Sequence, residues 1–124
     1  PLFVECTVDE TTGEELTPLA HSSSRRVFSE QTAEKLQELL AGVVAEGTGR
    51  QAAPSEGTAA GKTGTAQTGQ FRDGEELKNY WFAGFYPAEK PRWTIVVMQD
   101  AQTEPEVSSA AVFARLCDAL SAGE

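Results

Sequence analysis

Two apolar stretches separated by a short charged turn constrain the fold of this chain most strongly. Residues 79–86 read Asn-Tyr-Trp-Phe-Ala-Gly-Phe-Tyr, and residues 92–99 contain the run Ile95–Met98. Aromatic and β-branched residues at this density are typical of strands. Because only residues 87–91 separate the two strands, we expect them to form an antiparallel hairpin. The Ile95–Met98 run further predicts burial on both faces of its strand.

A helical pattern precedes these strands and another follows them. Residues 30–46 have the spacing of an amphipathic helix, with Ser29 placed to cap its first turn and Gly47 to end it. Its apolar stripe consists of Leu36, Leu39, Leu40, Val43 and Val44. The second helix is expected to begin near Thr103, with Pro105 in its first turn.

Residues 58–68 read as a further strand, although they hold few large side chains and include Gly61 and Gly64. A strand with so little bulk is weak by propensity, which predicts that another group approaches its backbone closely. Asp73-Gly74 marks a turn within the polar connection 70–78.

The first part of the chain predicts a small hairpin. Residues 2–8 are rich in strand formers, a return strand is expected around residues 14–19, and Thr12-Gly13 lies in the turn between them. The resulting order is strand, strand, helix, three strands and helix. This order predicts an α+β fold, an antiparallel β-sheet packed against helices, in one unit over residues 1–124.

The charge balance argues against several classes of protein. The chain has 124 residues with 10 basic and 19 acidic side chains, a net charge of -9. Nucleic-acid binders and proteins that dock on anionic membranes carry basic patches, so we expect neither function. No apolar stretch approaches the roughly 20 residues that span a bilayer, and no signal peptide is recognisable. Because the chain starts at Pro1 and its only methionine is Met98, we expect a piece of a longer or processed protein.

Cysteine and histidine are too sparse for a metal site. Cys6 and Cys117 lie near opposite ends and His21 is the one histidine, so we expect no metal and no cofactor. Cys117 falls among apolar residues of the second helix, which favours a buried thiol over a disulfide or a reactive group. His21, beside three serines, is expected to be solvated.

The stretch from Gly61 to Gln67, Gly-Lys-Thr-Gly-Thr-Ala-Gln, is the part of the sequence that carries chemistry. Side chains alternate along a strand, so Thr63 and Thr65 project to one face and Lys62 to the other. Two hydroxyls with nearby backbone N–H groups can hold a carboxylate or a developing oxyanion. Gly64 keeps bulk away from such a ligand, and the Lys62 ammonium adds positive potential to an acidic chain.

A phosphate-binding loop is an alternative interpretation of this stretch, and two features count against it. The spacing from Gly57 to Gly61 is shorter than the Walker pattern requires. In addition, a phosphate-loop lysine opens a helix, whereas Gly64 and Gly69 follow Lys62 closely and disfavour one.

Lys62-Thr63-Gly64 resembles the Lys-Thr-Gly motif of penicillin-binding proteins and serine β-lactamases. Gly47-Thr48-Gly49 lies between the predicted helix and the motif, as in transpeptidase domains of high-molecular-mass penicillin-binding proteins. Tyr80 to Ala88 resembles that family's Trp-Phe-x-Gly-x-x-Pro segment. The resemblance is good over residues 27–122 and weak over residues 1–26, and the Gly-Thr-Ala-Gln ending favours class B transpeptidases.

The resemblance implies part of a peptidoglycan D,D-transpeptidase that binds penicillin. In that family a serine attacks the D-Ala-D-Ala carbonyl of a stem peptide and forms an acyl-enzyme. By the same resemblance, Lys62 is catalytic and interacts with the hydroxyl of a Ser-x-Asn motif. Thr63 and Thr65 bind the terminal carboxylate of the substrate or β-lactam, with the Thr65 N–H as an oxyanion-hole donor. Gly64 permits the close approach of the ligand.

Two other motifs of the family are absent from this sequence. No serine stands three positions before any lysine, so Ser-x-x-Lys is missing, and none stands two positions before Asn79, so Ser-x-Asn is missing. We therefore expect one wall of an active site that is inactive alone, with the missing N-terminal part of the transpeptidase domain as its partner. The complete protein is expected at the extracytoplasmic face of a bacterial membrane, anchored by a missing segment. Trp81 and Phe82 are expected to be core residues.

Three alternatives remain open at the level of sequence. The first is a non-catalytic β-lactam-sensing module with the same fold. The second is a β-lactamase fragment, which the Gly-Thr-Gly and Trp-Phe contexts disfavour. The third is an unrelated α+β domain with a chance Lys-Thr-Gly. A Ser-x-x-Lys motif and a membrane anchor upstream of Pro1 would favour the transpeptidase.

Overall fold

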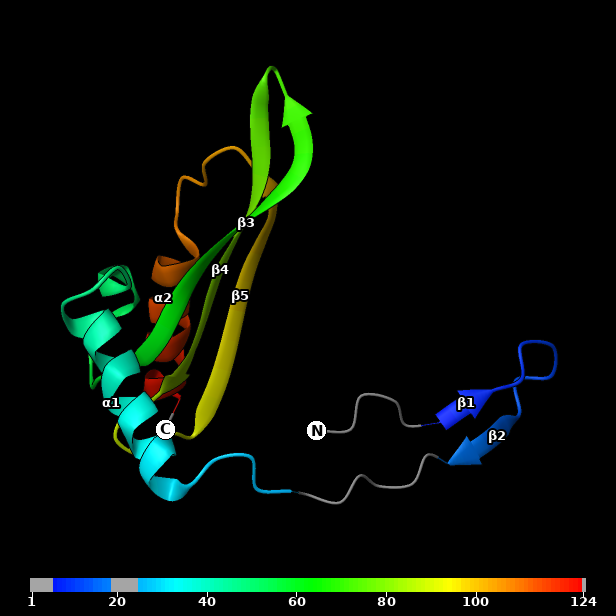
Figure 1. Ribbon diagram of the computed structural model, residues 1–124, viewed down its shortest axis with the longest axis horizontal. Helices are drawn as coiled ribbons and strands as arrows, with labels where there is room; N and C mark the ends of the chain where they lie inside the picture. The colour runs from blue at the N-terminus through cyan, green and yellow to red at the C-terminus, as the bar shows by residue number, and fades with distance from the viewer. Residues whose placement is uncertain (1–5, 19–24, 124) are drawn as a thin grey trace.

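The computed structural model describes residues 6–18 and 25–123. Its elements are β1 (Cys6–Val8), β2 (Glu15–Pro18), α1 (Glu30–Ala45), the 3-10 turn η1 (Arg50–Ala52), β3 (Ala60–Arg72), β4 (Glu75–Tyr86), β5 (Trp93–Gln102) and α2 (Ser109–Ala122). The main sheet has the order β3-β4-β5, and both of its strand pairs are antiparallel. Both helices cover one face of this sheet (Figure 1). The predicted α+β fold is confirmed.

Strands β1 and β2 form the predicted N-terminal hairpin, which lies apart from the main sheet (Figure 1). Gly13 has a φ of 72°, a left-handed conformation that glycine adopts without strain. The Asp9 carboxylate accepts hydrogen bonds from the Thr12 and Thr11 N–H groups at 2.8 and 2.9 Å, and these bonds lower the pKa of Asp9. The remainder of the predicted strand 2–8 and His21 lie outside the described residues.

Helix α1 confirms the predicted N-cap but only part of the predicted apolar stripe. The Ser29 Oγ accepts a hydrogen bond from the Thr32 N–H at 3.1 Å. Val44 is buried in the core, whereas Leu36 and Leu39 are exposed. Only part of the apolar stripe is therefore buried, because among the described residues only the C-terminal end of α1 reaches the core.

Gly47 follows the end of α1, as predicted, but for a steric reason. A Cβ at this position would lie 2.9 Å from both the Cα and the carbonyl oxygen of Val43. The Gly47 N–H donates to the carbonyl oxygens of Gly42 and Val43. The chain therefore turns so tightly against the last helical turn that there is no room for a side chain.

Strand β3 confirms the prediction that another group approaches a glycine-rich strand. A Cβ at Gly61 would lie 2.6 Å from Cε1 of Phe82, so the close neighbour is a core side chain of the same protein. The strand also continues to Arg72, beyond its predicted end. Asp73 and Gly74, with φ of 53° and 86°, form the predicted turn, and positive φ at both positions is typical of a tight two-residue hairpin.

Strand β5 corrects the prediction that the Ile95–Met98 run is buried on both faces. Ile95 and Val97 pack against the helix-covered core, whereas Val96 and Met98 are 58% and 45% exposed. The prediction that Trp81 is a core residue is wrong for the same reason. It lies on the face of the sheet away from the helices, and is 37% exposed. No described element covers that face (Figure 1).

Helix α2 begins later than predicted, with Ser108 rather than Thr103 as its N-cap. The Ser108 Oγ accepts from the Ala111 N–H at 3.2 Å. Residues 103–108 are instead tied to the sheet, because the Tyr80 hydroxyl donates to the Thr103 carbonyl at 2.6 Å. Thr103 therefore takes part in a tertiary hydrogen bond and does not cap a helix.

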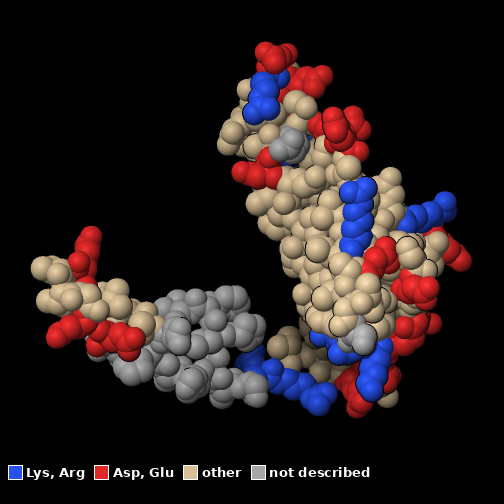
Figure 2. All heavy atoms as spheres, turned by 180° about the vertical axis from the view of Figure 1, so that it is seen from behind, with Lys and Arg blue, Asp and Glu red and all other residues tan. Residues whose placement is uncertain are grey.

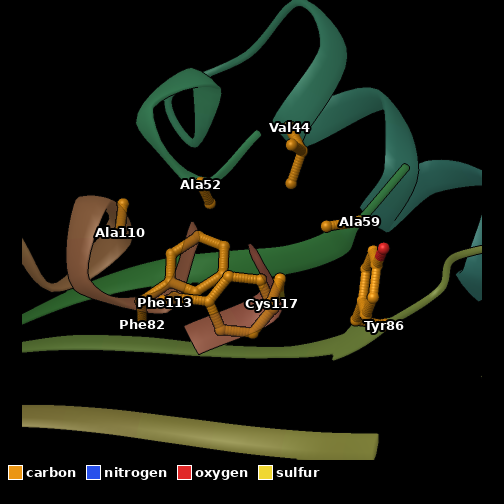
Figure 3. Packing of buried hydrophobic residues seen from close by; sticks show 8 residues of the cluster. All are labelled: Val44, Ala52, Ala59, Phe82, Tyr86, Ala110, Phe113 and Cys117. Atoms are coloured by element: carbon orange, nitrogen blue, oxygen red, sulfur yellow. The ribbon is translucent and has the colours of Figure 1, made fainter. Parts of the chain in front are cut away.

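The core lies between the two helices and the covered face of the sheet (Figure 3). Phe82 of β4, confirmed as a core residue, and Phe113 of α2 have ring centroids 4.7 Å apart. Cys117 is a fully buried, free thiol, as predicted. Burial, with a smaller contribution from the charge of Asp118, raises the pKa of Cys117 to about 11, so the thiol stays protonated and unreactive at neutral pH.

Candidate functional site

The Lys-Thr-Gly-Thr segment lies on β3, at an edge of the main sheet. Thr63 is paired with Phe82 and Thr65 with Tyr80, so both threonines share the helix-covered face. Lys62 and Gly64 alternate with them and belong to the other face. The register therefore places the threonines and the lysine on opposite faces, as predicted from the sequence.

The Lys62 ammonium nevertheless reaches its neighbour around the strand. Its Nζ donates to the Thr63 carbonyl oxygen at 3.0 Å and to the Thr63 Oγ1 at 3.1 Å. No carboxylate in the described part of the chain forms a salt bridge with Lys62. Its positive charge is therefore not neutralised by a described acidic group and is free to attract an anion.

A hollow of about 170 Å³ lies beside the two threonines. It is bounded by Thr48, Gln51, Thr63, Gly64, Thr65, Tyr80, Trp81, Pro105, Ser108, Ser109 and Ala110. Hydroxyl groups predominate among its polar side chains, and they come from four separate segments of the chain. Since ligand pockets commonly measure about 300–1,000 Å³, this hollow is smaller than a typical ligand pocket.

Several polar residues that line this hollow are not predicted as site residues from the sequence: Thr48, Gln51, Tyr80, Ser108 and Ser109. The Thr48 Oγ1 lies 3.3 Å from the Thr63 Oγ1, and the Ser108 Oγ donates to the Gln51 Oε1. In the sequence, Gly47-Thr48-Gly49 indicates the end of a helix and a family resemblance, but not a contact with Thr63. Because Thr48 and Thr63 meet through the tertiary fold, no local spacing could have paired them.

A larger hollow, about 790 Å³, lies between α1, the loop 53–59 and the turn at Ala88–Glu89. None of the Lys-Thr-Gly residues line it. Its lining consists mostly of small apolar residues and also includes Glu34, Glu38, Arg50 and Glu89. We place the candidate site at the smaller hollow, because Thr63 and Thr65 of the Lys-Thr-Gly-Thr segment line it, whereas neither lines the larger hollow.

Two parts of the molecule carry many acidic side chains. Figure 2 shows them along the side of the molecule formed by α1 and at the tip of the β3–β4 hairpin. The Lys35 ammonium donates to Glu38, and this bond lowers the pKa of the Glu38 carboxyl. Within residues 6–18 and 25–123, no group of three His, Cys, Asp or Glu side chains could hold a metal ion.

Comparison with known proteins gives one consistent family. The family described as penicillin binding protein transpeptidase domain matches residues 1–118. Stage V sporulation protein D of Bacillus subtilis is 35% identical over 103 residues, which are 81% of this chain and 16% of that protein. Penicillin-binding protein PbpB of Mycolicibacterium smegmatis is 38% identical over 117 residues, 82% of this chain and 17% of that protein.

A solved structure shares the fold. The D,D-transpeptidase domain of a peptidoglycan glycosyltransferase from Eggerthella lenta has a TM-score of 0.64 and 29% sequence identity, covering 96% of this chain and 27% of that one. The chain spans about a sixth of the length of the curated relatives it matches.

Proposed function

Because this chain belongs to the penicillin-binding protein transpeptidase family, we propose that it forms one wall of the active site of a serine-type peptidoglycan D,D-transpeptidase. The observation that carries the proposal is the edge strand on which Lys62, Thr63 and Thr65 lie beside a hydroxyl-lined hollow. The nucleophile comes from another part of the complete protein, since neither Ser-x-x-Lys nor Ser-x-Asn occurs in this sequence.

The threonines are assigned to the negative charges of the substrate. A stem peptide ends in a carboxylate, to which the Thr63 and Thr65 hydroxyls donate. The attacked carbonyl develops a second negative charge, for which the Thr65 N–H is the proposed donor. This role suits an edge strand, because such a strand has N–H groups that no neighbouring strand uses. Donors held in place before the reaction stabilise the transition state without reorganisation.

Lys62 is assigned to the proton transfer that accompanies bond exchange. The serine Oγ gives up its proton and forms an ester with the carbonyl carbon, while the bond from that carbon to the nitrogen of the last D-Ala breaks. The departing amine takes up a proton through the hydroxyl of Ser-x-Asn, which the Lys62 ammonium orients and polarises. The amine of a second stem peptide then attacks the ester, forming the cross-link and freeing the serine.

The ligands and location follow from this assignment. Stem peptides and β-lactams are the ligands, and the upstream part of the same transpeptidase domain is the partner that closes the site. The complete protein acts at the extracytoplasmic face of the bacterial membrane, held there by an anchor elsewhere in its chain. Within the part of the chain that the structure describes, no helix is long and apolar enough to cross a membrane.

Labelling with a fluorescent penicillin tests the proposal. We expect the complete protein to carry the label through denaturing electrophoresis, because its serine is acylated covalently. The 124-residue chain should remain unlabelled under the same conditions. A labelled band from the short chain, or no label on the complete protein, would contradict the proposal.

The Thr65→Val substitution in the complete protein tests the site itself. Valine has nearly the same shape but no hydroxyl, so acylation should slow by about 10- to 100-fold, the effect of losing one hydrogen bond to a charged group. Thr94→Val is the matched control, since Thr94 is exposed on β5 and far from the hollow. Equal rates for the two variants would show that the Thr65 hydroxyl does not take part in acylation.

A further inference from the structure

The Gly-Thr-Gly turn at residues 47–49 is tightly packed at the glycine on each side of Thr48. A Cβ at Gly49 would lie 3.1 Å from the Cγ1 of Val43 and 3.3 Å from the Cε2 of Phe82. A Cβ at Gly47 would lie closer still, 2.9 Å from both the Cα and the carbonyl oxygen of Val43. The Gly49 N–H donates to the Val43 carbonyl oxygen at 3.0 Å. Because the two glycines have no side chains, the turn can pack closely against the end of α1 and the core, and Thr48 is the only residue of the turn with a side chain.

The same aromatic ring also positions the Lys-Thr-Gly strand. Phe82 is the strand partner of Thr63 in the β3–β4 register, and it is fully buried. The turn and the strand are thus held against one rigid core residue. This arrangement keeps the Thr48 Oγ1 within 3.3 Å of the Thr63 Oγ1 without relying on a flexible side chain.

Two groups, the Lys62 ammonium and the Thr48 hydroxyl, contact the Thr63 hydroxyl, and their hydrogen-bonding capacities restrict its role. A threonine hydroxyl has one proton to donate and two lone pairs to accept with, whereas an ammonium can only donate. The Lys62 Nζ donates to the Thr63 Oγ1 at 3.1 Å and so occupies one lone pair. If the Thr48 hydroxyl donates to the other, the Thr63 proton is left to point toward a ligand.

We propose that Thr48 is a positioning residue that makes the Thr63 hydroxyl an obligate hydrogen-bond donor. With both lone pairs occupied, Thr63 can bind only an acceptor, and a carboxylate is the strongest acceptor available to it. Thr48 therefore sets the preference of the site for an anionic ligand without touching that ligand. The inference rests on the proposed function, in which Thr63 binds the substrate carboxylate.

The experiment uses the complete protein and two probes, benzylpenicillin and its methyl ester, whose carboxylate is blocked. Thr48→Val removes the hydroxyl at nearly constant shape. We expect acylation by benzylpenicillin to slow by about 3- to 10-fold, the range for one neutral hydrogen bond. The dissociation constant of the complex that precedes acylation should rise, while the rate constant of the acylation step stays unchanged. The Thr48→Val variant should react with the methyl ester within about twofold of the wild-type rate.

Three further variants separate positioning from a merely structural role. Thr48→Ser keeps the hydroxyl and should restore benzylpenicillin acylation to within about twofold of the wild-type rate. The double variant Thr48→Val/Thr63→Val should be no slower than Thr63→Val alone, because Thr48 acts only through Thr63. Thr94→Val, on exposed β5, controls for the loss of a threonine hydroxyl elsewhere in the protein.

The outcomes distinguish this inference from the proposed function. If the wild-type protein reacts and Thr63→Val slows it, while Thr48→Val has no effect, the inference about Thr48 is overturned and the proposed function stands. Equal losses for both probes, additive losses in the double variant, or a Thr48→Ser variant as slow as Thr48→Val would also overturn it. A wild-type protein that reacts with neither probe would overturn the proposed function itself.

Discussion

The two faces of the three-stranded sheet differ sharply although the same strands form them. On the helix-covered face, Phe82 is fully buried against Phe113. On the opposite face its neighbour Trp81 is partly exposed, and Val96 and Met98 are more exposed still. The difference shows that apolar sequence alone does not bury a strand. Burial on each face requires an element that packs there, and α1 and α2 both pack on the same side (Figures 1 and 3).

The candidate site lies at the boundary between these two faces. Thr63 and Thr65 belong to the covered face, whereas Lys62 and Gly64 belong to the open one. An edge strand offers groups from both faces to a ligand that approaches along the edge. A rigid covered face therefore fixes the threonines, while the ammonium remains in solvent and can turn toward a charge.

Adjacent residues on β4 give the largest expected contrast between the faces. Phe82→Ala in the 124-residue chain should lower the free energy of unfolding by about 3–5 kcal/mol, because it leaves a cavity in the core. Trp81→Ala, one position away on the open face, should cost well under half of that. Urea unfolding followed by circular dichroism measures both. If Phe82→Ala does not fold at all, Phe82→Leu supplies the smaller perturbation, and equal losses for Phe82→Leu and Trp81→Leu would contradict the contrast.

Replacing glycine with alanine tests the same contrast by adding a methyl group instead of removing side-chain atoms. A Cβ at Gly84 would lie 2.5 Å from the Ala60 carbonyl oxygen and 3.0 Å from the Phe113 ring, whereas a Cβ at Gly64 would lie 3.4 Å from the Trp81 Cβ. Overpacking a core costs about 1–3 kcal/mol, so Gly84→Ala should destabilise the chain by this amount. Gly64→Ala should change the free energy of unfolding by less than about 1 kcal/mol. Thermal unfolding of the two variants would contradict this if their midpoints fell equally.

Local chemistry explains which parts of the fold could be predicted from sequence. The Ser29 cap and the Asp73-Gly74 turn depend on hydrogen bonds and backbone angles set within a few residues, and both are confirmed. The Thr103 cap failed because the Thr103 carbonyl is held by Tyr80, a residue far away in sequence. The two-sided burial of β5 failed because an apolar run does not specify which elements will cover it.

The candidate site could likewise be predicted from the sequence only where local geometry determines it. The placement of Lys62 and Thr63 on opposite faces of a strand follows from alternation alone, so it could be predicted before the structure was known. The approach of Thr48 to Thr63 could not, because it depends on how two glycines pack the preceding turn against Phe82. The Gly-Thr-Gly sequence is the only local signal for this contact. Its glycines are required because the packing leaves too little space for a side chain at either position.

Adjacent valines on β5 give the smallest and most closely matched test of the two faces. Val97 packs against the core, whereas Val96 is exposed on the open face, and valine and threonine have nearly the same shape. Val97→Thr places a hydroxyl against apolar neighbours and should cost about 1–2 kcal/mol, because that hydroxyl loses its hydrogen bonds to water. Val96→Thr keeps its hydroxyl in water, so we expect a change within about 0.5 kcal/mol.

Urea unfolding of the two valine variants provides the measurement. Because the substitution and the strand are the same, any difference between the two free energies of unfolding reports only what each face touches. Equal losses would mean that the open face is covered in solution, for example by self-association. Repeating the measurement across a range of protein concentrations separates that case, since only an associated face gives a midpoint that rises with concentration. A concentration-independent gap between the variants is the result that the one-sided packing of this sheet requires.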